Sequence, residues 1–166
     1  LKLIRLDKVS TKGGSMRYFC ARDNSRWDVD ENVEKLKEEE VKANIGIGVF
    51  QEFQSKINNL KKDLTDFLKS QGNKNIVGYG ASATSTTLIS HFNLDQYFSC
   101  LIDDNPAKVG TYSPGYHIPV YGVEKLEEET PDIIIILAWR FYEQILPKLN
   151  RMKSQIILPL PTFKKL

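Results

Sequence analysis

Hydrophobic residues change their spacing along this chain, and each spacing predicts a different element. From residue 75 onward, short apolar runs alternate with segments of helical character. Strands are predicted at 75–79, 97–102, 132–138 and 154–158, and helices at 82–92, 122–129 and 140–151. The run Ile133–Leu137 is continuously apolar, which is typical of a central parallel strand covered on both faces. Right-handed crossovers between such strands predict a small Rossmann-like, doubly wound parallel sheet, an α/β fold.

The first 74 residues follow another pattern. Residues 1–22 are predicted to form a short β segment, and a helix is predicted to begin near Asp30 and to be interrupted at 45–48. A long amphipathic helix then follows, with Gly72 as its C-terminal cap. Its apolar residues recur at steps of three and four: Val49, Phe50, Phe53, Ile57, Leu60, Leu64, Phe67 and Leu68. We therefore expect three parts, with divisions after residues 22 and 74.

A glycine turn lies between the first strand and the first helix of the α/β part. Its sequence is Gly78-Tyr79-Gly80-Ala81-Ser82-Ala83, with the spacing G-x-G-x-x-A. In this interpretation Gly78 permits the turn, and Gly80 lacks a Cβ so that backbone N–H groups approach a phosphate. Ala83 allows the helix to pack closely on the strand, and Thr84 and Ser85 continue the helix. A helix N-terminus favours an anion, so the turn predicts a nucleotide-like ligand.

Other candidate residues follow the strands at the same edge of the sheet, where Gly80, Asp103 and Trp139 are expected to cluster. Asp103 lies 25 positions after Gly78, which suits a carboxylate that binds a ribose hydroxyl. An equally weighted alternative is a turn in which the carboxylates accept backbone N–H bonds before Asn105 and Pro106. Trp139 can line the ligand crevice, or it can pack between helix and sheet.

The segment 108–120 reads as a long loop rich in glycine, proline and aromatic residues. Long loops inside compact domains usually carry function or are flexible. Tyr112 or Tyr116 can stack on a base or sugar, and His117 can donate a hydrogen bond. For His117 the favoured interpretation is a partly buried structural histidine.

Composition narrows the classes of function. The formal net charge is +2, which argues against a strong nucleic-acid footprint, and the longest apolar run is far too short to span a bilayer. No signal peptide is apparent in the sequence, and the two cysteines lie far apart, so we expect a reduced, cytoplasmic setting. No histidines and cysteines have metal-binding spacing, and no nucleophilic triad is recognisable. Because the sequence opens with Leu1, we expect a piece of a longer protein.

An ordered series of motifs resembles a known family. The motifs are the glycine turn at 78–83, Ile102–Gly110, Tyr112–Val120, Pro131–Trp139 and Leu158–Pro161. In this order they resemble the C-terminal domain of S-adenosylmethionine-dependent sugar C-methyltransferases, which methylate nucleotide-linked deoxyketosugars. Lys12–Arg17 resembles that family's His-Gly-Gly-Ser-Leu-Arg segment, near the end of its central methyltransferase domain. The resemblance covers almost the entire chain.

The resemblance implies a substrate-binding domain for a nucleotide-linked sugar, with 1–22 the tail of the central domain, 23–74 a helical connector and 75–166 the C-terminal domain. The residues expected to bind substrate are Gly78, Tyr79, Gly80, Ala81, Ser82, Ala83, Thr84, Ser85, Asp103, Asn105, Lys108, Tyr112, His117 and Trp139. No catalytic residue, metal or cofactor is expected in this chain. S-adenosylmethionine belongs to the methyl-donor domain of the full-length family, which is the expected protein partner. Neither nucleic acid nor a membrane is expected as a partner.

Two positions depart from the family pattern. Thr84-Ser85 stands where the family often has Lys-Gly, so a cation that meets a diphosphate is missing, and Lys12 replaces the family's histidine. Residues 1–74 contain neither a cysteine cluster nor a methyl-donor glycine motif, so the chain alone is expected to be inactive. A weaker likeness to the nucleotide-sugar-binding domains of some sugar acetyltransferases points the same way.

Two alternatives stay open beside a substrate-binding module. The glycine turn together with Asp103 also suits a stand-alone NAD-type dinucleotide-binding domain. The Thr84-Ser85 departure suits a Rossmann-like domain that only packs against partners.

Overall fold

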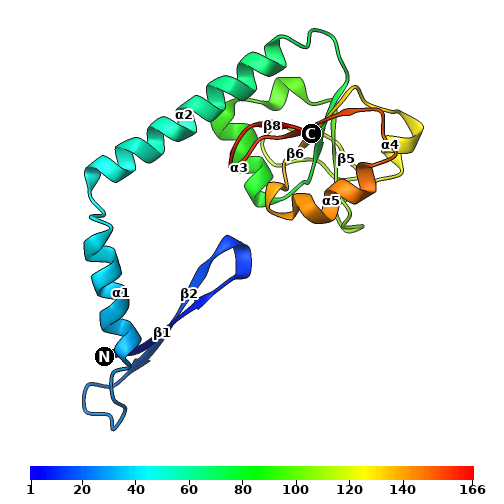
Figure 1. Ribbon diagram of the computed structural model, residues 1–166. Helices are drawn as coiled ribbons and strands as arrows, with labels where there is room; N and C mark the ends of the chain where they lie inside the picture. The colour runs from blue at the N-terminus through cyan, green and yellow to red at the C-terminus, as the bar shows by residue number, and fades with distance from the viewer. The chain divides into compact units, whose positions relative to one another are not determined.

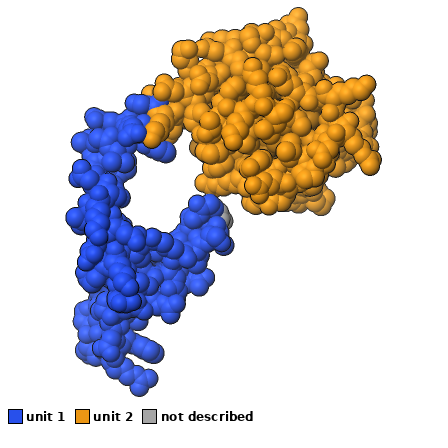
Figure 2. All heavy atoms as spheres, in the orientation of Figure 1, with its two compact units in different colours: residues 1–55 blue, residues 56–166 orange. Residues whose placement is uncertain are grey.

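The computed structural model describes the whole chain except the side chain of Lys12, so the expectation for that side chain lies outside the described residues. The chain forms two compact units, Leu1–Ser55 and Lys56–Leu166 (Figure 2). The boundary falls inside helix α2 (Ile47–Lys69), which contributes residues to both units. The three-part division expected from the family resemblance stays a prediction.

The first unit is built on an antiparallel hairpin of β1 (Lys2–Val9) and β2 (Ser15–Ala21), joined by the short 3-10 turn η1 (Thr11–Gly13). Helix α1 (Glu31–Lys42) begins at Asp30, whose carboxylate accepts the N–H of Asn32 at 3.0 Å. The Asn32 side chain in turn donates to the Leu6 carbonyl oxygen, and Val33 is buried. These contacts fix α1 to β1 and confirm a β segment followed by a helix.

The second unit, coloured from cyan-green to red in Figure 1, holds a six-stranded sheet. Its strand order is β5-β4-β3-β6-β7-β8. Five strands are parallel, and β8 pairs antiparallel with β7. The strands are β3 (Ile76–Tyr79), β4 (Cys100–Ile102), β5 (Val120–Tyr121), β6 (Ile133–Ile136), β7 (Gln155–Leu158) and β8 (Lys164–Lys165). The order reverses between β3 and β6, because the chain moves outward through β4 and β5 before it returns to β6. That reversal is the switch point of a Rossmann-like sheet.

Helices cover both faces of the sheet. The connecting helices are α3 (Ala83–Phe92), α4 (Lys125–Glu128) and α5 (Tyr142–Leu149), with 3-10 turns η2 (Asp95–Tyr97) and η3 (Trp139–Phe141). One core combines α2 and α3 with the sheet face that presents Ile133 and Ile135. The second core combines α4 and α5 with the opposite face, which presents Ile134 and Ile136. The predicted doubly wound α/β fold is therefore confirmed.

Several local predictions need correction. The strand predicted at 97–102 shrinks to Cys100–Ile102, because η2 occupies the preceding residues. Strands β5 and β8 were not predicted, since two-residue strands give no periodic signal. Gly72 has a φ of +62°, but it lies three residues beyond the last residue of α2, in the following turn. It shapes that turn and does not directly cap the helix.

Candidate functional site

The β3–α3 turn lies at the carboxyl edge of the sheet, beside the switch point. Its second glycine, Gly80, has a φ of +111° and donates its N–H to the Ile102 carbonyl at 2.6 Å. A Cβ on Gly80 would lie 2.6 Å from the Cβ of Ala138 and 2.9 Å from its backbone nitrogen. Gly80 is therefore required because the segment after β6 packs directly against it. The space that a Gly80 side chain would take is filled by Ala138. The approach of backbone N–H groups to a phosphate at Gly80 stays a prediction.

The first glycine of the motif has a packing role. Gly78 is a buried residue within β3, and a Cβ there would lie 2.5 Å from a methyl carbon of Leu137 and 2.7 Å from one of Leu101. The prediction that Gly78 permits the turn is therefore wrong. Its missing side chain lets the side chains of Leu101 and Leu137 close over β3.

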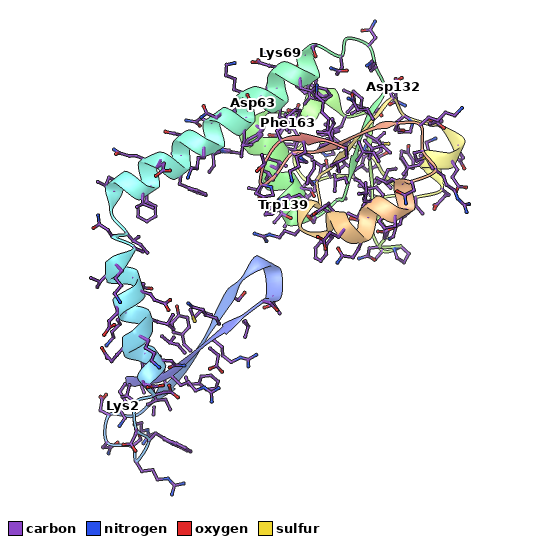
Figure 3. The ribbon with its side chains drawn as sticks, in the orientation of Figure 1. Lys2, Asp63, Lys69, Asp132, Trp139 and Phe163 are labelled. Atoms are coloured by element: carbon purple, nitrogen blue, oxygen red, sulfur yellow. The ribbon has the colours of Figure 1, made fainter. Side chains whose placement is uncertain are left out.

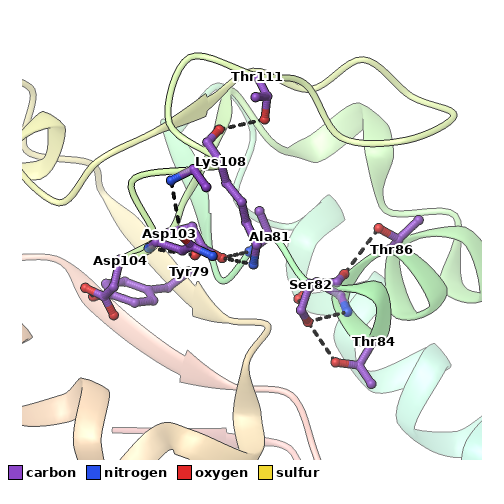
Figure 4. A network of polar contacts seen from close by, with 12 residues as sticks. Tyr79, Ala81, Ser82, Thr84, Thr86, Asp103, Asp104, Lys108 and Thr111 are labelled. Atoms are coloured by element: carbon purple, nitrogen blue, oxygen red, sulfur yellow. Dashed lines mark hydrogen bonds and ion pairs between the residues drawn. The ribbon is translucent and has the colours of Figure 1, made fainter.

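Asp103, directly after β4, closes the turn from the other side (Figure 4). Its Oδ2 accepts the N–H of Ala81 at 2.7 Å and the ammonium of Lys108 at 2.9 Å, and its Oδ1 accepts the N–H of Asn105 at 3.0 Å. The Asn105 side chain continues the loop by accepting the N–H of Ala107. These bonds match the turn-closing alternative. A ribose contact by Asp103 stays a prediction.

The carboxyl of Asp103 stays ionised because of these donors. Burial by itself favours the neutral acid and would raise the pKa of Asp103. The N–H groups of Ala81 and Asn105, together with the Lys108 ammonium, outweigh burial and bring the pKa below its usual value. The Asp103–Lys108 pair is thus a fixed, nearly neutral element of the site.

Open hydrogen-bond donors begin one residue after this network. Ser82 is the N-cap of α3, and its Oγ accepts the N–H of Ser85 at 3.2 Å and contacts the hydroxyls of Thr84 and Ser85 (Figure 4). Ser85 is fully buried. Within the described hydrogen bonds, the backbone N–H groups of Ser82, Ala83 and Thr84 donate to no protein acceptor. The glycine-turn part of the predicted site therefore divides into a structural segment, 78–81, and the segment 82–84, whose N–H groups are open.

Tyr79 belongs to the core and not to the open edge. Its ring is almost fully buried, and its hydroxyl donates to Asp104 Oδ1 at 2.9 Å, while Lys148 donates to Asp104 Oδ2 at 2.9 Å. Burial raises the pKa of Tyr79, and the hydrogen bond to Asp104 raises it further. The phenol therefore stays a donor that ties β3 to the loop after β4. A contact between Tyr79 and the substrate stays a prediction.

The segment 108–120 forms a hairpin-like excursion. Val120 exchanges backbone bonds with Gly110 and Thr111, and Ser113 pairs with Ile118 through backbone and hydroxyl. Tyr112 and His117 are both exposed. His117 has a φ of +53°, which places it in the tight turn at the tip. The favoured interpretation of His117 as partly buried is therefore wrong, because the turn points it to solvent.

Trp139 lies directly beside the switch point. It follows Ala138, whose N–H donates to the Tyr79 carbonyl at 3.0 Å, and its half-buried ring packs on the α5 side of the sheet. The Arg140 guanidinium lies over that ring, 4.9 Å from its centroid. The structure therefore brings the segments of Gly80, Asp103 and Trp139 to one edge, as predicted. Tyr112 and His117 lie on the separate hairpin-like excursion.

Other kinds of site find no support in the described part of the chain. No cluster of three or more metal-ligating side chains occurs there, and Cys20 and Cys100 are free thiols. None of the described helices is both long enough and apolar enough to cross a bilayer.

Comparison with known proteins agrees with the resemblance seen in the sequence. The pattern of the C-methyltransferase C-terminal domain family matches residues 10–161. The chain belongs to this family. It is 23% identical over 168 residues to the C-methyltransferase NovU of Streptomyces niveus. That alignment covers 97% of this chain and 40% of NovU, so the chain spans less than half the length of this relative.

A solved structure is also similar to part of the domain. UDP-D-quinovosamine 4-dehydrogenase from Vibrio fischeri aligns with a TM-score of 0.42 and 14% identity, over 56% of this chain and 93% of that chain.

The sequence did not reveal two residues that contact the candidate site of this C-methyltransferase C-terminal domain. Ala138 limits position 80 to glycine, and Lys148 pairs with Asp104 from 44 residues away. A small residue directly after the apolar run of β6 was a usable signal for Ala138. Nothing in the sequence pairs Lys148 with Asp104, because that contact depends on how α5 crosses the sheet.

Proposed function

We propose that this chain is the nucleotide-sugar-binding module of a sugar C-methyltransferase. The observation that carries the proposal is the set of three successive N–H groups, Ser82 to Thr84, which donate to no described protein acceptor at the start of α3. They lie at the switch point of a Rossmann-like sheet, in a chain of the C-methyltransferase C-terminal domain family. Such N–H groups, with the helix dipole behind them, suit the phosphate groups of a nucleotide sugar.

Other residues at the same edge of the sheet fix the geometry of the proposed site. Asp103 and Lys108 hold the turn so that Ala81 is already engaged and the free donors begin at Ser82. Thr84 is exposed beside these donors, and its hydroxyl contacts Ser82 Oγ at 2.8 Å. In this proposal Trp139 lines the edge of the site, and Tyr112, exposed on the hairpin-like excursion, contacts the base or the sugar. In this proposal the residues bind and orient the substrate, and none of them moves a proton.

Methyl transfer itself is assigned to a separate S-adenosylmethionine-binding domain of the same protein. A base of that domain would take a proton from the carbon beside the sugar ketone. The resulting carbanion would attack the methyl group of the sulfonium, and the methyl–sulfur bond would break to release the neutral thioether. A cytoplasmic location is part of the same proposal, in keeping with two cysteines that are free thiols.

A dinucleotide-binding function is the second candidate, because G-x-G-x-x-A and an acidic residue after the next strand are both present. The contacts of Asp103 weigh against it. Its carboxylate already accepts from Ala81, Asn105 and Lys108, so it is less available for a ribose hydroxyl than a free carboxylate. Trp139 also stands at the switch point, where a second nucleoside would have to extend.

Titration of the chain with UDP-sugars, dTDP-sugars, NAD and NADP tests the proposal. Binding is followed by the backbone amide NMR signals, which also report millimolar affinities. We expect deoxysugar nucleotide diphosphates to bind better than NAD, with the largest shifts at Ser82, Ala83 and Thr84. NAD is expected not to saturate below millimolar concentration, about −4 kcal/mol. Micromolar NAD affinity, or shifts confined to another edge of the sheet, would overturn the assignment.

A further inference from the structure

The site at the start of α3 has free N–H donors but no cation of its own. Position 84 is threonine and position 85 is serine, and Ser85 is fully buried against Ser82. A diphosphate carries about two negative charges, and neutral donors alone bind it less strongly than donors with a cation. A basic residue from another segment is therefore the expected complement.

Three lysines from the segments around this edge are already paired. Lys108 donates to Asp103 at 2.9 Å, and Lys148 donates to Asp104 at 2.9 Å. Lys125, at the start of α4, pairs with Glu129 at 2.8 Å. Each of these cations would have to leave a carboxylate before it could bind a phosphate.

Arg140 differs from these lysines. Its side chain is exposed, and within the described residues it forms no ion pair. Its guanidinium lies 4.9 Å from the centroid of the Trp139 ring, an arrangement that restrains the guanidinium without using its N–H donors. The Arg140 guanidinium is thus a restrained cation whose N–H groups are free to bind a ligand.

The backbone places Arg140 beside the glycine turn. Ala138, two residues earlier, donates its N–H to the Tyr79 carbonyl, and it fills the space where a Gly80 side chain would lie. The turn η3 therefore leaves the sheet next to the start of α3, and Figure 3 shows Trp139 at that end of the domain. Two segments that lie nearly 60 residues apart in the sequence meet there.

We propose that Arg140 is the cation that binds the diphosphate of the substrate, in place of the lysine absent at the start of α3. This inference rests on the proposed function of the same site. The planar guanidinium suits a phosphate because two of its N–H groups can bind two phosphate oxygens at once. Arg140 is then the residue that gives the site its preference for a diphosphate over an uncharged ligand.

The test compares Arg140→Gln, Arg140→Lys and the wild-type chain in NMR titrations with a UDP-sugar and a dTDP-sugar. Arg151→Gln is the matched control, because Arg151 is also exposed but follows α5, on the way to the opposite edge where β7 begins. We expect Arg140→Gln to weaken binding about tenfold or more, the effect of losing a charged hydrogen bond. The affinity of Arg140→Lys should lie between those of wild type and Arg140→Gln. The affinity of Arg151→Gln should stay within about twofold of wild type.

The outcomes separate this inference from the proposed function. If the wild-type chain binds neither sugar nucleotide, the proposed function and the role of Arg140 both fail. If the wild type binds and Arg140→Gln binds equally well, only the role of Arg140 fails. Equal weakening by Arg140→Gln and Arg151→Gln would also overturn it, since the effect would then reflect net charge. A shallower dependence of binding on salt in Arg140→Gln alone would support the direct contact.

Discussion

Gly80 and Asp103 hold the β3–α3 turn from two sides. Because Gly80 has no Cβ, Ala138 can take the space beside it, and Asp103 accepts the N–H of Ala81. Each residue matches a position of a nucleotide-binding motif. In this fold, however, the contacts of each residue hold the β3–α3 turn in place. Substitutions here are therefore expected to change stability before they change binding.

Gly80→Ala is expected to destabilise the chain by about 2–4 kcal/mol, because the new Cβ meets Ala138 at a φ of +111°. The free energy of unfolding in urea measures this. Gly115→Ala is the matched control, with a φ of +83° and nothing within 4 Å of the added Cβ. Its free energy of unfolding should fall by about 1 kcal/mol, the cost of placing a residue with a Cβ in this backbone conformation. Equal losses at both positions would contradict the packing role of Ala138.

Asp103→Asn is expected to lower the free energy of unfolding at pH 7 by about 2 kcal/mol, because charged hydrogen bonds are lost. The pKa of Asp103 is lower in the folded state than its usual 3.8, so folding favours the ionised carboxyl. Its contribution is complete above that usual value and is lost as the pH falls through the lower, folded-state pKa. Urea unfolding at pH 7 and at acid pH should therefore show the difference between wild type and variant shrinking below pH 3.8.

Asp63→Asn, an exposed site on α2, controls for the loss of one charge and should change the unfolding free energy little at either pH. A constant difference for Asp103→Asn across the pH range would show that its carboxylate charge is not what closes the turn.

At the scale of elements, α2 carries one apolar stripe with two different surroundings. The stripe runs from Phe50 to Leu68 with helical spacing. Near its C-terminal end, Leu64, Phe67 and Leu68 are buried on the sheet, whereas Phe50 and Phe53 are exposed. Periodicity is the same along the helix, so the sequence does not distinguish its two halves.

Leu64→Ala is expected to cost about 2–5 kcal/mol, because Leu64 is 0% exposed and its loss leaves a cavity in the core. Phe53 is 61% exposed, so Phe53→Ala should change the unfolding free energy by less than about 0.5 kcal/mol. Chemical denaturation of the two variants measures both effects. A loss for Phe53→Ala as large as that for Leu64→Ala would mean that the N-terminal half of α2 is covered in solution.

At the scale of the whole molecule, the cores and the sheet belong to residues 56–166, and the hairpin with α1 belongs to residues 1–55. The second unit has its own apolar core on each face of its sheet. It therefore meets the physical requirement for a domain that folds alone.

A chain shortened to residues 56–166 is expected to unfold in one cooperative transition, with a midpoint close to that of the full chain. The reason is that every residue of both cores lies after Ser55. Thermal unfolding followed by circular dichroism measures the midpoint. A non-cooperative transition in the shortened chain would show that residues 1–55 contribute to the core.

The chain alone is expected to transfer no methyl group from labelled S-adenosylmethionine to a ketosugar nucleotide. The sequence carries no methyl-donor glycine motif, and the proposed site binds and orients without proton transfer. Measurable turnover of the label by the purified chain would contradict this division of labour. Binding of the sugar nucleotide in the same sample is the positive control.

The sequence by itself determined the α/β class, the parallel strands and the glycine turn. The reason is that these depend on local periodicity and on residues such as Gly80 whose conformation few side chains adopt. The run of isoleucines in β6 identified a strand buried on both faces, and the structure has it at the centre of the sheet. The ordered motifs likewise identified the family.

Only the tertiary structure decided what each residue of the turn contacts. Gly78 lies under Leu101 and Leu137, Tyr79 donates to Asp104, and His117 points to solvent. These contacts join segments that lie tens of residues apart, and side-chain spacing along the chain carries no information about them. The same holds for the halves of α2, because burial depends on what packs against a stripe, and the stripe alone does not fix its partner.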